Sequence, residues 1–367
     1  MLHRRSLLAT GAALGLAGAA RRSEAAGATL AALGAAKGIL VGTATRGASL
    51  AGIQPYAATV NREFDLIVSG VEMQWKAVAP TPDRTVFTRI DPIVDWAAQH
   101  HKKFRGHALV WYHELPGWFG ELPGRDAAVA AMRAHIRTMC THFAGRVYCW
   151  DVVNEALSRT PTASRPLWDS PLARLIGPDF VEIAFHTARE TDPHALLCYN
   201  DYAVEMNDAP QHAKQAFLVR YIHDMRARGV PIDVVGIQSH LRLEDMHNFD
   251  ERAFAAFLDA LASTGVKIML TELDVADRGA PGDVGTRDRE VAAAYRRYLD
   301  VALANRAVIA LITWGFVDTD SWVTRGDLPA FRRDDGQAPR PLPFDGGYNP
   351  KPAYEAIADA LRAAPAR

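Results

Sequence analysis

The sequence predicts a single closed α/β barrel in which eight parallel strands alternate with helices. Three observations favour it: eight short, β-rich apolar runs recur along the 367 residues, segments with helical apolar spacing lie between them, and no linker, repeat or low-complexity tract divides the chain. Eight strand and helix units favour a (β/α)8, or TIM, barrel of one domain over an open doubly wound sheet.

The expected strands, in chain order, are 39–43, 65–69, 103–111, 147–154, 195–200, 234–239, 267–272 and 309–315. Several are apolar along nearly their whole length, which is typical of parallel strands covered on both faces. The expected helices are 90–99, 127–143, 180–190, 211–228, 253–262 and 289–304, with a closing helix after Pro352. No Gly-rich phosphate loop follows the first strand, which argues against a dinucleotide-binding fold.

Composition and charge indicate a globular protein with a substantial core and an uncharged or weakly charged ligand. Apolar residues make up 49% of the chain and charged residues 23%, and the formal net charge is -1. No Lys/Arg-rich run is interleaved with aromatic residues, so no nucleic-acid partner is expected.

The first 26 residues are interpreted as a twin-arginine export signal. Arg4 and Arg5 precede a Gly/Ala/Leu stretch at 7–20 that is too short and too glycine-rich to span a bilayer stably, and a small-x-small cleavage site follows at 23–25. An ordinary secretory signal and an uncleaved anchor are the alternatives. The expected catalytic domain is 27–367, exported to the periplasm or the extracellular space.

Three cysteines, Cys140, Cys149 and Cys198, show no metal-binding spacing. A bridge between Cys140 and Cys149 is possible, but the spacing alone does not establish it. We expect all three to be small core residues.

Carboxyl groups lie at two of the predicted strand ends, where chemistry is placed in this architecture. The fourth run ends in Asn154-Glu155, and the seventh ends in Glu272-Leu-Asp274. Two opposed carboxyl groups are what glycosidic cleavage requires, because one protonates the leaving oxygen while the other attacks, or activates water, at the anomeric carbon. Structural ion pairs at the strand ends are the alternative interpretation.

The end of the sixth run carries Gln238 and His240, which are two residues apart and face the same way along a strand. We expect His240 to hold the Glu272 carboxylate and Asp274 to hold the imidazole, while Gln238 orients Glu155. A single histidine at a strand end is more often an ordinary polar residue, but here it joins a group of acids.

Five tryptophans fall at or just beyond predicted strand ends: Trp75, Trp111, Trp118, Trp314 and Trp322. Sugars present C–H faces that stack on aromatic rings and hydroxyls that need polar partners, so this pattern is typical of a polysaccharide cleft. Core packing is the alternative for any one of these rings.

A series of motifs follows in order between residues 64 and 354: Arg105-Gly-His107-Ala-Leu-Val-Trp111, Trp150 to Ala156, Gly236-Ile-Gln238-Ser-His240, Thr271-Glu272-Leu-Asp274, Thr313-Trp314-Gly315 through Ser321-Trp322, and DGGYNPKPAY at 345–354. With these motifs the chain resembles glycoside hydrolase family 10, the retaining endo-β-1,4-xylanases. The resemblance covers nearly all of the chain after the predicted signal.

The resemblance implies that Glu155 is the general acid/base and Glu272 the nucleophile, with net retention through a covalent glycosyl-enzyme and carboxyl groups about 5 to 5.5 Å apart. It implies that Asn154 binds the sugar 2-hydroxyl. The further substrate contacts expected are His107, Trp111, Tyr199 on the leaving-group side, Trp314, Trp322, Gln74 and Trp75. No cofactor or metal is implied, and we expect a monomer. The pKa of Glu155 should be raised by burial and by the charge of Glu272.

The chain departs from the family pattern after the second and third strands, at Gly70, Val71, Gln74, Tyr112 and Glu114. The first three replace the glutamate, asparagine and lysine that normally grip the glycone sugar. Losing three polar contacts, each of about 0.5 to 1.5 kcal/mol, weakens that subsite or adapts it to another sugar. Our hypothesis is intact hydrolytic chemistry with altered recognition, which suits a decorated xylan, a different β-glycan or short oligosaccharides.

Two rival functions come from other classes. A non-catalytic carbohydrate-binding barrel would tolerate loss of a catalytic acid, yet both glutamates and their expected partners are present. A zinc hydrolase would need ligands such as His107, His113 and His240 to meet, but the sequence has no HExxH or similar spacing.

Overall fold

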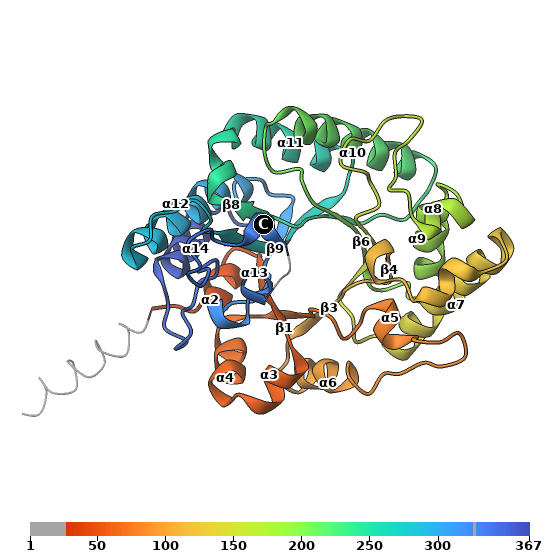
Figure 1. Cartoon of the computed structure of the whole chain (residues 1–367), viewed down its shortest axis with the longest axis horizontal. Coiled ribbons are helices and arrows are strands. Elements are labelled where there is room, and N and C mark those ends of the chain that lie inside the picture. The colour runs from red at the N-terminus through yellow and green to blue at the C-terminus, as the bar shows by residue number, and fades with distance from the viewer. Residues whose placement is uncertain (1–26, 326–327) are drawn as a thin grey trace, which may run out of the picture.

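The chain forms a closed barrel of eight parallel strands, as the sequence predicts (Figure 1). The computed structural model describes residues 27–325 and 328–367, so the predicted export signal lies outside the described residues. Strand β10 pairs with both β9 and β1 and thereby closes the barrel. The barrel strands are β1 (Leu40–Thr45), β2 (Leu66–Ser69), β3 (Lys103–Gly106), β5 (Cys149–Asn154), β6 (Leu196–Asp201), β7 (Val234–Ile237), β9 (Lys267–Ala276) and β10 (Val308–Thr313).

Two of the predicted strands are interrupted where they reach the barrel mouth. The third run ends at Gly106 and resumes as β4 (Val110–Trp111), and between them the Leu109 amide donates to the Asp151 carbonyl. The sixth run leaves β7 and continues as β8 (His240–Arg242) after Ser239, whose φ is +64°. A left-handed residue cannot continue a strand, so the predicted 234–239 run is too long.

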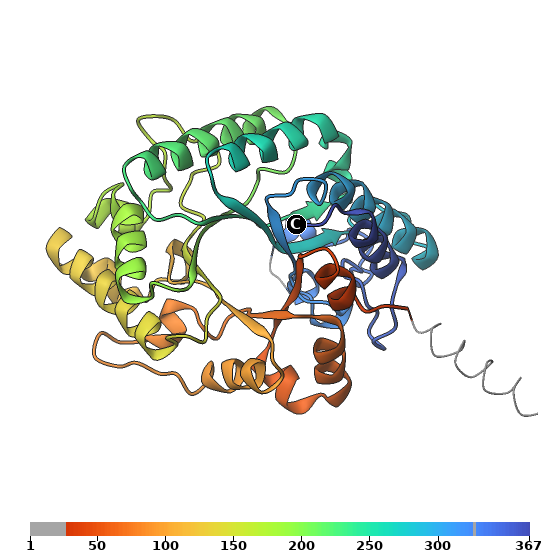
Figure 2. The ribbon, with the colours of Figure 1, turned by 180° about the vertical axis from the view of Figure 1, so that it is seen from behind.

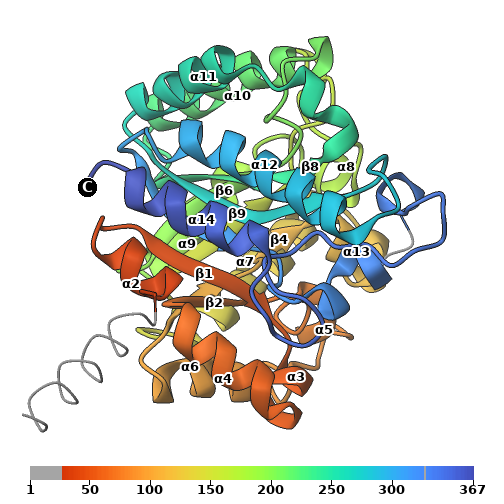
Figure 3. The ribbon, with the colours of Figure 1, turned by 90° about the vertical axis from the view of Figure 1, so that its left-hand side faces the viewer.

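Helices surround the barrel, and the view from behind shows the same ring (Figure 2), while the side view shows α10 and α11 on one side of the strands and α4 and α6 on the other (Figure 3). The seven predicted helices are present within a few residues of their expected bounds: α6 (Asp91–Gln99), α7 (Arg125–His142), α9 (Phe180–Thr191), α10 (Ala209–Ala227), α11 (Glu251–Ser263), α12 (Val284–Ala302) and α14 (Pro352–Ala363). Aspartates at the N-caps of α10, α11 and α12 accept amides of the first turn, which fixes where these helices begin.

Six helices were not predicted: α2 (Leu30–Ala35), α3 (Gly47–Gly52), α4 (Gln54–Glu63), α5 (Trp75–Val78), α8 (Pro171–Leu175) and α13 (Trp322–Arg325). Most are a single turn or two, too short to show a helical period. Helices α2 and α14, near the two ends of the described chain, lie side by side (Figure 3). No helix among the described residues is long and apolar enough to cross a membrane.

The core has two layers. Mainly small and branched side chains fill the barrel interior, including Cys149, Cys198 and Val68, and a larger cluster packs the strands against the helices. All three cysteines are buried and free, so the possible bridge between Cys140 and Cys149 is wrong and the expectation of core residues is confirmed.

The long segment after β10 is held in place by buried ion pairs. Asp318 accepts from the Lys351 ammonium at 3.0 Å, and Arg287 of α12, which pairs with Asp277 at 2.6 Å, also donates to the Ala338 carbonyl at 2.6 Å. These contacts fix the segment that carries Trp322 over the barrel mouth, where Trp322 donates to Asp274 at 2.6 Å.

Candidate active site

Strand register brings the predicted site residues into one row at the carboxyl ends of the strands. Trp111 of β4 lies opposite Asn154 of β5, and Asn154 lies opposite Asn200 of β6. On the other side of the mouth, His240 of β8 lies opposite Asp274 of β9. Neighbouring parallel strands therefore supply side chains at the same height, which is where this architecture places chemistry.

Glu155 follows β5 directly and is held by neutral donors. The Gln238 amide donates to Oε1 at 2.8 Å, and the Trp111 indole donates to Oε2 at 3.0 Å. The backbone of Glu155 is left-handed, with φ +56°, and its amide donates to the Asn200 carbonyl at 2.8 Å. This turn lifts the side chain out of the strand alternation and leaves it 9% exposed.

The pKa of Glu155 is raised to about 7. Burial is the largest cause, the charge of Glu272 adds to it, and the Gln238 hydrogen bond opposes it. A carboxyl group in this environment holds its proton near neutral pH.

Glu272 lies within β9 and is surrounded by positive charge. His240 Nε2 lies 3.2 Å from Oε2, and His240 Nδ1 lies 3.0 Å from Asp274 Oδ1. Burial alone would raise the pKa of Glu272, but the His240 hydrogen bond and the charges of His107, His240 and Arg105 outweigh it and lower the pKa. Burial would likewise lower the pKa of His240, but Asp274 and Glu272 raise it well above its usual value. Glu272 is therefore held as a carboxylate.

Asn200, which no sequence pattern singled out, links the two glutamates. Its Nδ2 donates to Glu272 Oε1 and to Asn154 Oδ1, both at 2.8 Å, while Thr271 donates to its Oδ1 at 2.7 Å. Asn154 Oδ1 also receives the Gln238 amide at 3.3 Å. The amide side chains of Asn200, Asn154 and Gln238 thus connect Glu155 and Glu272 through one hydrogen-bonded network.

The His107 ring is held by a second buried residue, Asp151, whose role no sequence pattern indicated. Its Nδ1 lies 2.6 Å from Asp151 Oδ2, which also pairs with the Arg105 guanidinium at 2.5 Å. The His107 ring lies 5.2 Å from the Trp314 ring and 5.9 Å from the Trp111 ring, measured between centroids. The structure therefore brings these three predicted substrate contacts together, beside the two glutamates.

Tyr199 does not face the site, and its predicted contact with the substrate is wrong. Cys198, its neighbour on β6, points into the barrel interior, so strand alternation turns Tyr199 toward the helices, 6.1 Å from Tyr221 of α10. Its hydroxyl donates to Asp201 at 2.8 Å and accepts the Leu157 amide at 3.1 Å.

Trp75 is likewise a core residue, which corrects the prediction of a sugar contact. Its side chain is 1% exposed, stacks on His135 at 4.2 Å and packs against Phe119 at 5.2 Å. Gln74, also predicted to bind substrate, is 3% exposed and its Oε1 has no hydrogen-bond partner among the described residues. The role of Gln74 stays a prediction.

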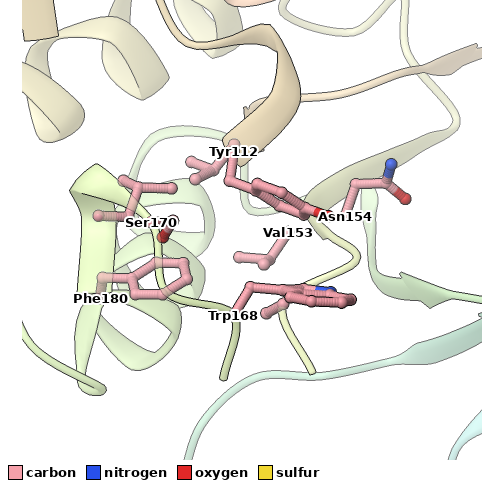
Figure 4. Close-up of a pocket in the computed structure, with 9 residues that line it drawn as sticks. Tyr112, Val153, Asn154, Trp168, Ser170 and Phe180 are labelled. Carbon is pink, nitrogen blue, oxygen red and sulfur yellow. The ribbon is translucent and has the colours of Figure 1, made fainter. Parts of the chain in front are cut away.

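A small cavity lies behind Asn154 (Figure 4). Its volume is about 10 Å³, and the stacked rings of Tyr112 and Trp168, 6.0 Å apart, form part of its wall. The cavity is too small for a sugar, so it belongs to the packing that supports Asn154 and not to the substrate cleft. Within the described residues, no group of three or more His, Cys, Asp or Glu side chains is placed to hold a metal ion.

Known proteins share both the sequence and the fold. The sequence model of the family described as Glycosyl hydrolase family 10 matches residues 29–360. Endo-1,4-beta-xylanase B from Thermotoga neapolitana is 37% identical over 316 residues, which cover 85% of each chain. The chain is also 31% identical to Exoglucanase XynX from Acetivibrio thermocellus over 89% of its own length, but it spans only 29% of that longer protein.

Among solved structures, xylanase 10B from Thermotoga petrophila RKU-1 in complex with xylobiose superposes with a TM-score of 0.81 at 33% identity, over 91% of this chain and 97% of that one. Native xylanase 10B from Thermotoga maritima gives a TM-score of 0.80 at 34% identity, over 91% and 98% of the two chains. Matching sequence, barrel and site motifs lead to one conclusion: the chain belongs to glycosyl hydrolase family 10.

Proposed function

We propose that this glycoside hydrolase is a retaining endo-β-1,4-xylanase that cleaves the backbone of xylan or a related β-glycan. Glu155 acts as the general acid/base and Glu272 as the nucleophile. The observation that carries the proposal is the difference between the two carboxyl groups, which share one hydrogen-bonded network while burial holds a proton on Glu155 and His240 keeps Glu272 ionised.

In the first step, the Glu155 carboxyl donates its proton to the glycosidic oxygen while a Glu272 oxygen attacks the anomeric carbon from the opposite face. The bond from the anomeric carbon to the leaving oxygen breaks, the aglycone leaves as an alcohol, and a glycosyl ester forms on Glu272. The neutral acid and the charged nucleophile that this step needs are the protonation states favoured by the surroundings of the two residues.

In the second step, the Glu155 carboxylate takes a proton from a water molecule while the oxygen of that water attacks the anomeric carbon. The ester bond to Glu272 breaks, which restores the carboxylate and leaves Glu155 protonated. While Glu272 is an ester it carries no charge, so its repulsion no longer raises the pKa of Glu155, and Glu155 acts as a base more readily.

The sugar that is cleaved would lie between Asn154 and the aromatic side chains. The Asn154 amide is held by Asn200 and lies next to Glu155, a position suited to the 2-hydroxyl of that sugar. His107, Trp111 and Trp314 lie together beside it, and Trp322 packs 5.0 Å from the His240 ring. These four side chains supply the aromatic faces and the polar group that a pyranose needs.

A second candidate substrate follows from the segment after β2. There the chain carries Gly70 and Val71, whose side chain is 45% exposed, in place of polar residues. Lys76 pairs with Glu114 at 2.9 Å, so the cation of this segment is already engaged by an acid from the loop after β4. An altered glycone subsite of this kind suits a decorated xylan, a different β-glycan or short oligosaccharides.

The test is a panel of xylan, arabinoxylan, mixed-linkage β-glucan and defined oligosaccharides, with proton NMR of the first sugar released. The proposal expects hydrolysis of unbranched xylan and a β-anomer as the first product. An α-anomer would exclude retention, preference for another glycan would favour the second candidate, and binding without cleavage would leave a non-catalytic carbohydrate-binding barrel.

We also propose that the chain is exported by the twin-arginine route and works as a monomer outside the cytoplasm. The support for export is the Arg4-Arg5 pair and the cleavage pattern before Ala26. Replacing both arginines by lysine should hold the precursor in the cytoplasm, and secretion at the wild-type level would contradict this route. Light scattering of the mature chain tests the monomer.

A further inference from the structure

Glu205 is a buried carboxylate that the proposed hydrolysis does not use. It lies between β6 and α10 and is 4% exposed. Its Oε1 accepts the Ser239 amide at 2.9 Å, and its Oε2 accepts the Val204 amide at 2.8 Å. Burying a carboxylate costs free energy, so we expect a buried carboxylate to hold a backbone conformation that packing alone does not stabilise.

The residue that Glu205 fixes is in a disfavoured conformation. Ser239 has φ +64°, in the left-handed region that residues with a Cβ rarely adopt. Its other polar groups are also held: the hydroxyl lies 2.7 Å from the Tyr298 hydroxyl and donates to the Ile237 carbonyl at 3.1 Å, and its carbonyl accepts the Asp274 amide at 3.4 Å. The Ser239 turn is therefore restrained from β9, from α12 and from Glu205.

The two residues that flank Ser239 are the ones that touch the two glutamates. Gln238 donates to Glu155 at 2.8 Å, and His240 lies 3.2 Å from Glu272. In an extended strand, residues 238 and 240 would share a face but would stay in the ladder of β7. The left-handed turn takes the chain out of β7 and into β8, so that each side chain reaches a different carboxylate.

We propose that Glu205 is a positioning residue for hydrolysis: by holding the Ser239 amide it fixes the turn that presents Gln238 to Glu155 and His240 to Glu272. The inference rests on the proposed function and adds one residue that acts on both steps. Two titratable side chains, those of His240 and Tyr298, interact electrostatically with Glu205.

The direction of the effect follows from the two hydrogen bonds. Each of them stabilises the ionised form of a glutamate, so loosening the turn removes stabilisation of charge from both. The pKa of Glu272 and the pKa of Glu155 then both rise. Because Glu272 must be ionised and Glu155 protonated, the acidic limb and the alkaline limb of the pH profile move to higher pH together.

The experiment compares Glu205→Ala with a matched control, Glu63→Ala, in the mature chain. Glu63 is also 4% exposed and accepts a main-chain amide, that of Leu30 at 3.1 Å, but it lies at the end of α4 away from the two glutamates. Thermal unfolding establishes that both variants are folded, and kcat and KM on xylopentaose are measured across the pH range.

For Glu205→Ala we expect kcat to fall about tenfold with a smaller change in KM, and both limbs to move up by about half a pH unit. Glu205→Gln, whose carbonyl oxygen can still accept the Ser239 amide, should recover part of kcat. Glu63→Ala should lose stability only. Wild-type kcat and unshifted limbs in Glu205→Ala, or the same shifts in Glu63→Ala, would overturn the proposal.

Glu205→Asp serves as a second variant if Glu205→Ala does not fold. It keeps the charge, but its shorter side chain draws the carboxylate away from the Ser239 amide, and we expect both limbs to move in the same direction by a smaller amount. Unmoved limbs and wild-type kcat in Glu205→Asp would then overturn the proposal. All variants are compared with the wild-type chain on one substrate, so failure of the proposed function appears as an inactive wild type, and failure of this inference as an unaffected variant.

Discussion

Two glutamates at the mouth of one barrel have opposite surroundings. Glu155 receives hydrogen bonds from the neutral amide of Gln238 and the indole of Trp111, whereas Glu272 is paired with His240, which is in turn held by Asp274. The two groups are chemically identical, so their different protonation arises from their neighbours alone. Neutral donors leave burial to dominate the pKa, while a charged donor reverses it.

The largest expected effect comes from replacing Glu272, the glutamate whose partner is the charged His240. Glu272→Ala removes the nucleophile and leaves a side chain that cannot form the glycosyl ester, so turnover of xylooligosaccharides should fall by about five orders of magnitude. Steady-state assays on xylopentaose measure it. Glu190→Ala, which alters an acid with a 67% exposed side chain, is the control and should retain wild-type activity. Residual activity within tenfold of wild type would contradict the assignment.

The second largest effect comes from replacing Glu155, the glutamate that receives only neutral donors. Glu155→Ala should lower turnover of xylopentaose by about a thousandfold, because the leaving alcohol is no longer protonated. Aryl xylobiosides with an activated phenol need no proton in the first step, so their burst of phenol should survive while the steady state slows. Added azide, a nucleophile that needs no base, should restore the second step and give a β-glycosyl azide. Equal losses on both substrate types would contradict the acid/base role.

The pH profile sharpens the comparison without a change of fold. For the wild-type chain, kcat/KM should fall above about pH 7, where Glu155 loses its proton, and fall again in acid, where Glu272 gains one.

Gln238→Leu removes a hydrogen bond that stabilises the ionised form of Glu155, so the pKa of Glu155 rises and the alkaline limb moves to higher pH. Asp274→Asn removes the charge that keeps His240 protonated, so the acidic limb moves to higher pH. Exchange of these two outcomes would refute the assignment of roles.

The smallest effect concerns the segment after β2. Gln74→Lys returns a cation to a position where the buried Gln74 Oε1 has no partner among the described residues. If this segment binds the glycone sugar, KM for xylopentaose should fall a few-fold, which corresponds to about one hydrogen bond, while kcat changes little. An unchanged KM with unchanged kcat would show that this segment takes no part in binding the glycone sugar.

The barrel and the position of the two glutamates at its mouth were predictable because they depend on local pattern, whereas their catalytic roles rest on the family resemblance and stay a proposal. Apolar runs mark the strands, and acids at strand ends mark the mouth, so Glu155 and Glu272 needed no knowledge of partners. Asn200 and Asp151 were missed because their importance depends on which strands pair and in what register. Tyr199 was misplaced although the strand period already indicates its orientation, since Cys198 beside it is an interior residue.

Other features could not be read from the sequence at all. The left-handed turns at Glu155 and Ser239 occur in residues that carry a Cβ, so no glycine marks them. They exist because tertiary hydrogen bonds from distant segments restrain them, and only the folded chain brings those donors and acceptors together.

The most direct test of the central claim is to trap the intermediate with an activated 2-deoxy-2-fluoro-β-xylobioside and to map the label by peptide mass spectrometry. The fluorine slows both steps, and the activated leaving group lets the first outpace the second. Our account predicts time-dependent inactivation with one fluoroxylobiosyl group per chain, attached to the peptide that contains Glu272. Attachment to any other residue, or hydrolysis with no covalent adduct, would contradict it.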